Sequence, residues 1–220
     1  MARPGPDKII LCPLCSSLAA CQTWMSGNTF GIRLWSDGKS IAPMLHPEPL
    51  IVKCPHCNGC YWRHDAKESG EMYRFRPDPD DKEAQINPDW IAAPRVEDPC
   101  EADYFKAIDE GFAKTPEQER ILRILAWWSS NDKFRENNTA SNWSLSEAGR
   151  RNLEALIALL DESEVNDLIR KAEVLRELGQ FERATELLAR ITSEGHTGVV
   201  RQLCSFCDVA DPGLKELRLS

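Results

Sequence analysis

Two short cysteine motifs constrain this chain more than any other feature. Cys12-Pro13-Leu14-Cys15 and Cys54-Pro55-His56-Cys57 share the pattern Cys-Pro-x-Cys, and 38 residues separate them. Two residues between cysteines let both thiolates of a pair reach one ion, and two such pairs provide the four ligands of a tetrahedral zinc site. The sequence therefore predicts a structural Zn²⁺ site formed by Cys12, Cys15, Cys54 and Cys57.

The residues around these motifs have the pattern of a small antiparallel sheet. Residues 29–35 are rich in β-forming side chains, Ser36-Asp37-Gly38-Lys39 is a strong hairpin turn, and residues 40–45 can form the returning strand. Residues 50–53 lead into the second motif and residues 61–63 lead out of it. We therefore expect one β domain over residues 8–64.

Residues 8–64 resemble the zinc-ribbon (rubredoxin-knuckle) family, whose signature is a pair of Cys-Pro-x-Cys turns on a three-stranded sheet. The sequence departs from the common form because Asn58, and not glycine, follows the fourth cysteine. The resemblance implies a structural metal site and says almost nothing about function. In so small a sheet, metal ligation is expected to supply on the order of 10 kcal/mol of folding free energy. The alternative is that the cysteines are free or redox-active thiols.

The other five of the nine cysteines give no second metal site. An odd number at irregular spacing argues against a secreted disulfide framework and favours a reducing, cytoplasmic compartment. Cys204 and Cys207 form a third pair, but with Leu203 they follow the spacing of a helix core. We predict that they are core residues, because a second zinc site would need two further ligands and only the scattered Cys100 or His196 could supply them. Cys21 and Cys60 are expected to be packed or surface thiols.

A signal peptide is an alternative interpretation of the N-terminus. Basic residues precede the apolar run 9–18, and Leu18-Ala19-Ala20-Cys21 resembles a lipobox, which would make the chain an envelope lipoprotein lipidated at Cys21. That processing would remove Cys12 and Cys15. Because the run contains a motif that recurs later in the chain, we favour a cytoplasmic protein with no membrane partner. No other segment approaches membrane-spanning length.

Residues 65–100 have the composition of an acidic, proline-rich linker. The stretch Arg76-Pro77-Asp78-Pro79-Asp80-Asp81 and three later prolines disfavour long regular elements. We expect a surface linker that Trp90 and Ile91 order in part.

Residues 101–220 have a helical period. Thr115-Pro116-Glu117 is a helix start, and helices are expected over about 115–132, 146–160, 164–178, 180–193, 198–209 and 212–217. The predicted fold class is therefore α+β, with a small antiparallel β zinc ribbon followed by an all-α domain of helical hairpins.

One hairpin, at about residues 164–193, is similar to a tetratricopeptide repeat. The small positions of the repeat are taken by Ala172 and Ala184, and the turn by Gly179. The aromatic position after the turn is Phe181, and Leu188 and Ile191 close the second helix. Leu168 stands where the family prefers Trp, and no proline follows the repeat. The resemblance implies a surface that binds a peptide or helix of another protein. The alternative is an ordinary helical hairpin.

The charge distribution bears on the choice of partner. The net charge is −8, with +3 in residues 1–64 and therefore −11 in the remainder. No phosphate-binding loop, dinucleotide fingerprint, nucleophile elbow or metal-hydrolase motif is present, so we do not expect an enzyme. We predict a zinc-binding adaptor for another protein, and the alternative is a factor that binds RNA or DNA through the ribbon. The candidate partner-binding residues are Arg33, Lys39, Arg63, Trp127 and Trp128.

Overall fold

The computed structural model describes residues 2–73, 87–136 and 143–218. The chain divides into two compact units. Unit 1 comprises Met1–Gly31 and Ala42–Cys100, and unit 2 comprises Ile32–Ile41 and Glu101–Ser220. Antiparallel strands at the N-terminus are followed by helices, so the α+β class is confirmed. The segment Ile32–Ile41, which we expected in the β domain 8–64, belongs instead to the helical unit.

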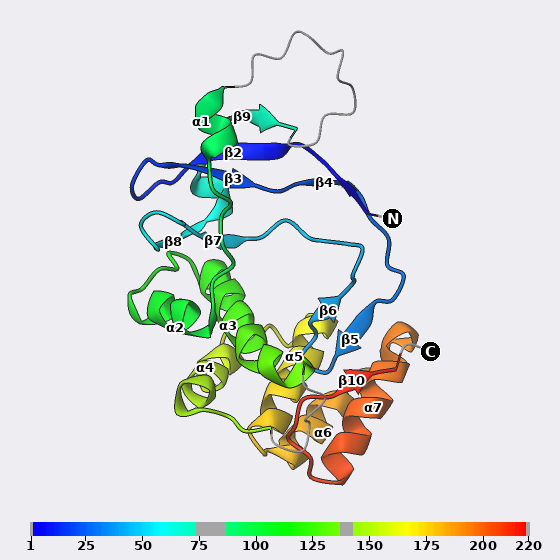
Figure 1. The fold of residues 1–220 in the computed structure, drawn as a ribbon. Helices are drawn as coiled ribbons and strands as arrows, with labels where there is room; N and C mark the ends of the chain where they lie inside the picture. Colours follow the sequence, from blue (N-terminus) through cyan, green and yellow to red (C-terminus); the bar gives the residue numbers. More distant parts are fainter. Residues whose placement is uncertain (1, 74–86, 137–142, 219–220) are drawn as a thin grey trace. The chain divides into compact units, whose positions relative to one another are not determined.

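Unit 1 is built on a three-stranded antiparallel sheet. Its central strand β2 (Asp7–Leu11) pairs with β3 (Leu18–Cys21) on one side and β9 (Lys67–Met72) on the other (Figure 1). Ile9 and Ile10 are both fully buried, so the two faces of β2 contribute to two different apolar clusters. The sheet therefore has a core on each side, as its continuous run of apolar residues requires.

Each cysteine motif lies at the turn of a β-hairpin. The first lies between β2 and β3, and the second lies between β7 (Ile51–Lys53) and β8 (Cys60–Trp62). A further short pair joins β1 (Arg3–Pro4) to β4 (Trp24–Ser26). The strands expected at 50–53 and 61–63 are confirmed to within one residue, while β2, β3 and β9 were not predicted.

Much of the predicted linker is an integral part of unit 1. Besides β9, residues 94–97 connect the two hairpins: the Val96 amide donates to Ala20 O at 3.0 Å, and Lys53 and Glu97 exchange backbone hydrogen bonds of 2.9 and 3.0 Å. The helix α1 (Pro88–Ala92) places the Trp90 ring against Gly70 of β9. The linker prediction for 65–100 is therefore wrong in these parts. Its proline-rich stretch 76–81 lies outside the described residues.

The helices of unit 2 pack mainly against their neighbours in sequence (Figure 1). For five of these helices the predicted and observed bounds agree to within a few residues, and one further helix, which was not assigned bounds from sequence, precedes these five. The helices of unit 2 are α2 (Glu101–Asp109), α3 (Pro116–Glu136), α4 (Glu147–Ile157), α5 (Val165–Glu177), α6 (Phe181–Ala189) and α7 (Thr197–Asp208).

The turn between α5 and α6 has the hydrogen bonds of a Schellman motif. Gly179 adopts a φ of 77°. The Gln180 amide donates to Leu175 O at 2.8 Å, and the Gly179 amide donates to Arg176 O at 2.9 Å. Two small residues, Ala172 and Ala184, are 1% and 0% exposed in the same apolar cluster. The predicted helical hairpin is therefore present, with glycine at the left-handed turn position.

The helix expected over 212–217 is wrong. The segment ends in β10 (Glu216–Leu217), which pairs with β5 (Arg33–Trp35), and β5 pairs in turn with β6 (Ser40–Ile41). The Ser36 amide donates to Lys215 O at 2.8 Å. These long-range bonds satisfy the backbone of a segment whose Pro212 and Gly213 weaken a helix.

Candidate metal centre

The structure brings the four predicted cysteine ligands together. Their sulfur atoms all lie within 4.8 Å of one another, although the two motifs are far apart in sequence. The Sγ–Sγ distance is 3.9 Å between Cys12 and Cys57 and 3.7 Å between Cys15 and Cys54. With zinc–sulfur bonds of about 2.3 Å, the edge of a regular tetrahedron is about 3.8 Å. The cluster therefore has the size of a tetrahedral tetrathiolate site.

The two motifs have the same backbone geometry. The amide two residues after the first cysteine of each pair donates to that cysteine's sulfur at 3.4 Å, from Leu14 to Cys12 and from His56 to Cys54. Ser16 and Asn58 follow the second cysteines and have φ values of 59° and 57°. Asparagine tolerates this left-handed conformation better than most residues. The departure from glycine at Asn58 therefore leaves the turn intact.

The sulfurs differ in their surroundings. Cys12 and Cys54 are buried, whereas Cys15 and Cys57 are exposed. Burial raises the pKa of the Cys12 thiol to about 12, while hydrogen bonds from Ser17 lower the pKa of the Cys15 thiol to about 6. A cation coordinated by all four would hold them as thiolates. The cluster is thus compatible with a metal site, with one edge at the surface.

The remaining cysteines do not form a second cluster among the residues that the structure describes. Cys21 is 1% exposed, in the apolar cluster that also contains Cys12 and Cys54. Cys207 is 6% exposed, and both it and Cys204 pack in the cluster around Leu203. The prediction that Cys204 and Cys207 are core residues is confirmed.

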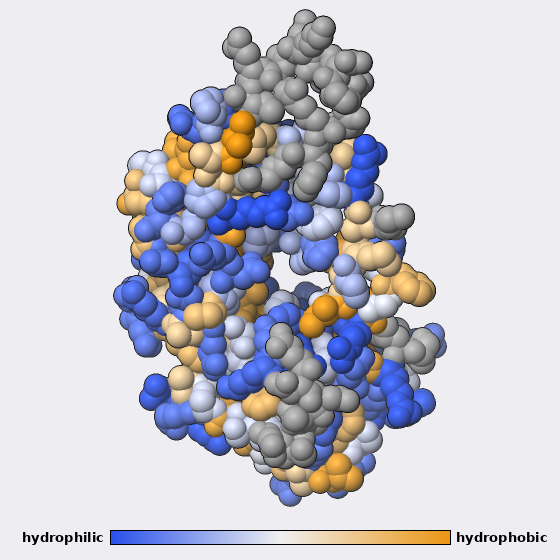
Figure 2. Space-filling model, viewed as in Figure 1, coloured by the Kyte–Doolittle hydropathy of each residue, from blue (hydrophilic) through white to orange (hydrophobic). Residues whose placement is uncertain are grey.

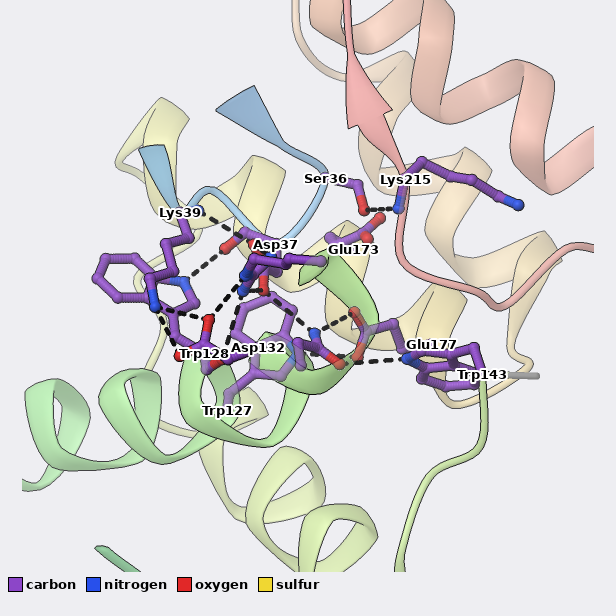
Figure 3. Close-up of polar contacts among 12 residues, drawn as sticks. Ser36, Asp37, Lys39, Trp127, Trp128, Asp132, Trp143, Glu173, Glu177 and Lys215 are labelled. Carbon is purple, nitrogen blue, oxygen red and sulfur yellow. Dashed lines mark hydrogen bonds and ion pairs between the residues drawn. The ribbon is translucent and has the colours of Figure 1, made fainter. Parts of the chain in front are cut away.

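Two predicted partner-binding residues, Arg33 and Lys39, lie on the β5–β6 hairpin of unit 2, which we call the inserted hairpin because residues Ile32–Ile41 interrupt the sequence of unit 1. Arg33 Nη2 lies 2.6 Å from Glu216 Oε2. Lys39 Nζ lies 2.7 and 2.8 Å from the two carboxylate oxygens of Asp132 (Figure 3). Both cations therefore have intramolecular counter-charges.

The tryptophan pair Trp127-Trp128 contributes to a buried polar network (Figure 3). Trp127 is 2% exposed, and its Nε1 donates to Glu177 Oε2 at 2.7 Å. Trp128 is half-buried, and its Nε1 donates to Asp37 O at 3.0 Å. Asn131 Nδ2 connects the carboxylates of Asp37 and Glu177 at 3.1 and 3.0 Å. The hydrogen bonds of this network connect the inserted hairpin to α3 and α5.

The fifth predicted residue, Arg63, lies in unit 1. It is 6% exposed, and its Nη2 lies 3.2 Å from Glu68 Oε1. The structure thus gives all five side chains contacts within the chain. A role for them in binding a partner remains a prediction.

Within the described parts of the chain, no helix combines the length and apolar character needed to cross a bilayer. No known family model matches this sequence, and comparisons with curated proteins and with solved structures give no significant match either.

Proposed function

We propose that Cys12, Cys15, Cys54 and Cys57 hold one structural Zn²⁺ and that unit 1 is a zinc ribbon. The observation that carries this is the convergence of four sulfurs within 4.8 Å at the turns of two matched hairpins. Four protein thiolates complete a tetrahedral shell and leave no position for water or substrate. The metal would therefore act on folding and not in hydrolysis.

Metal analysis of purified protein tests this assignment. We expect one zinc per chain in wild type and a loss of most of it in Cys54→Ser. Cys60→Ser is the matched control, because Cys60 lies close to the motif and outside the cluster. If the purified protein instead contains iron and shows the absorption spectrum of a ferric tetrathiolate, the four cysteines bind iron in place of zinc. A metal-free wild type, purified under reducing conditions, would contradict the proposal.

The chain as a whole would then be a non-catalytic adaptor for another protein, with α5 and α6 as a tetratricopeptide-like pair. The sequential packing of the helices and the glycine turn with small flanking residues support this. The inserted hairpin and residues 211–213 cover α5, since Arg176 donates to Ser36 Oγ, Asp211 O and Gly213 O. A partner would therefore bind the exposed side of α6, where Glu182, Arg183 and Glu186 reach solvent.

Affinity capture of the full chain from its native host, with mass-spectrometric identification, tests the adaptor role. A protein that is also captured in the reciprocal direction is the expected result. Figure 2 shows hydrophilic residues interspersed with hydrophobic ones on the face in view. Glu182 and Glu186 are exposed on α6, so reversing both charges (Glu182→Lys with Glu186→Lys) is expected to reduce capture of a partner that binds this helix. The control is Glu154→Lys on the exposed side of α4. Failure of reciprocal capture would contradict the adaptor role.

The contacts of the basic residues favour an adaptor over a nucleic-acid factor. Arg33 and Lys39 each lie within 2.7 Å of a carboxylate oxygen, which neutralises the charge that phosphates would need, and Arg63 is only 6% exposed, so it lies off the surface that a nucleic-acid backbone would contact. Salt-dependent binding of single-stranded RNA or DNA that Lys39→Ala abolishes would support the alternative. An intact-mass measurement addresses the lipoprotein alternative, because lipidation at Cys21 requires the loss of residues 1–20.

A further inference from the structure

Unit 1 contains a pocket of about 450 Å³ that the candidate metal centre does not use. Its walls come from the segment before β7, from the 3₁₀ helix η1 (Arg63–Asp65) and from β9. This volume lies within the range of small-ligand sites. The lining combines a few charged side chains with apolar ones, chiefly Glu48, Pro49, Leu50, Arg63, Ala66 and Glu68.

Arg63 is the buried charge of this pocket. Its side chain is 7% exposed, its backbone amide donates to Leu50 O at 2.9 Å, and its Nη2 lies 3.2 Å from Glu68 Oε1. The sulfur of Cys21 is a further partner of the guanidinium. The buried Nε has no hydrogen-bond partner among the described residues. A guanidinium carries five N–H donors, so Arg63 is incompletely satisfied in a place where water has little access.

The carboxylates beside Arg63 do not fully match it. Glu68 Oε1 is shared with Lys8 Nζ at 3.1 Å, so one oxygen serves two cations. Glu48 Oε1 lies 3.7 Å from Arg63 Nη2, which is beyond hydrogen-bond distance, and its side chain is 60% exposed. When Glu48 turns out into solvent, Arg63 keeps only Glu68 as a counter-ion in the pocket lining, and Glu68 shares its oxygen with Lys8 outside the lining. Glu48 therefore lies where a better-placed anion could bind.

We propose that this pocket binds a carboxylate attached to a compact apolar body. The carboxylate would displace Glu48 from Arg63, because a planar carboxylate matches the guanidinium through paired hydrogen bonds. The apolar body would lie against Leu50, Pro49 and Ala66. Two sources have this chemistry: a small organic acid, and the C-terminal carboxylate of a peptide that ends in an apolar residue.

Titration of the metal-loaded full chain, followed by NMR chemical shifts, tests the proposal with three probes. They are 4-methylpentanoate, the tripeptide Ala-Ala-Leu with a free C-terminus, and the same tripeptide with an amidated C-terminus. Binding of the first or second, with perturbed signals from Leu50 and Ala66, is expected, and their relative affinity distinguishes the two sources. Equal binding of the free and amidated peptides, or binding of no probe, would overturn the proposal.

Glu48→Gln gives an independent test that does not depend on a buried position. Removal of a loosely held, exposed competitor is expected to tighten binding about three- to fivefold. The matched control is Glu71→Gln, which removes the same charge from an exposed position on β9 that does not line the pocket. Unchanged affinity in Glu48→Gln, or the same gain in Glu71→Gln, would overturn the proposal. Arg63→Gln should abolish binding, with zinc content and amide shifts as evidence that it folds.

Discussion

The carboxylate of Asp37, in the turn between β5 and β6, is paired with the guanidinium of Arg135 on α3, and the two side chains are 0% and 3% exposed. Asn131 and the Lys39 amide supply further hydrogen bonds to the same carboxylate, at 3.1 Å each. The Arg135 guanidinium also lies over the Trp35 ring, 5.3 Å from its centroid. The turn of the inserted hairpin is therefore held by a charge pair without access to water.

Substitution of Asp37 should destabilise unit 2 strongly. Asp37→Asn keeps the shape but leaves Arg135 as a buried charge without its main counter-ion, which costs about 3–5 kcal/mol. The matched control is Asp132→Asn, which removes another carboxylate that Arg135 contacts, one that is 41% exposed. A surface pair contributes about 0–1 kcal/mol. Denaturant unfolding followed by tryptophan fluorescence measures both, and equal losses would show that the buried pair has no special role.

Glu177 predicts a pH dependence of stability. Burial, together with the nearby carboxylates of Glu173 and Asp37, raises its pKa well above the usual range. An acid with a raised pKa in the folded state favours folding when it is protonated. Its contribution is complete below the pKa of the unfolded chain and is lost as the pH rises towards the folded-state pKa, at up to about 1.4 kcal/mol per pH unit.

Glu177→Gln should remove this component of the pH dependence. The amide stays neutral, so the variant should show a flatter pH profile than wild type. A constant loss is superimposed on this profile, because Trp127 and Asn131 donate to different oxygens of Glu177 and an amide offers only one acceptor oxygen. Unfolding free energies at several pH values, with the helical circular dichroism signal as readout, measure the difference. A Glu177→Gln profile that stays parallel to that of wild type at every pH would show that Trp127 and Asn131 require an ionised carboxylate.

The parts of the fold that sequence predicts best are those set by residues close together in the chain. The cysteine motifs and the Ser36–Lys39 turn specify local geometry, and both are present. Of the pair Trp127-Trp128, only one ring can be fully buried on a helix, and Trp127 is that one. The helical spacing of apolar residues within single segments also predicted the positions of five helices.

The errors have a common physical cause, which is pairing between distant segments. Lys67–Met72 is polar and mostly exposed, so nothing in its sequence predicts β9, yet the edge of β2 provides backbone partners for it. The turn at 36–39 was recognised, but its assignment to unit 2 depends on Arg135 and Asn131, about a hundred residues away. The pocket at Arg63 is not predictable from local sequence either, because its lining comes from two separate stretches, residues 48–50 and 63–68.

Removal of the metal should unfold unit 1 and leave unit 2 helical. The sheet is small, and structural zinc contributes on the order of 10 kcal/mol to folding in such domains. In a chelator we expect loss of amide protection in β2, β3 and β7 with little change in helical circular dichroism. Cys12→Ser should show the same loss without a chelator, whereas Cys60→Ser should remain protected. Protected strands in the metal-free chain would mean that the apolar clusters alone suffice.

The contact between Gly70 and Trp90 allows a test of the structure in residues 65–100, the segment that was expected to be a linker. A Cβ on Gly70 would lie 2.1 Å from the Trp90 ring, far inside van der Waals contact. Gly70→Ala should therefore displace α1 from β9 and destabilise unit 1 by about 1–3 kcal/mol. Gly195→Ala is the control, because a Cβ there meets nothing within 4 Å. Hydrogen exchange at β9 and the fluorescence of Trp90 measure the effect. If Gly70→Ala leaves β9 as protected as wild type, α1 does not rest on this strand, and residues 87–92 would after all behave as the surface linker that their sequence suggested.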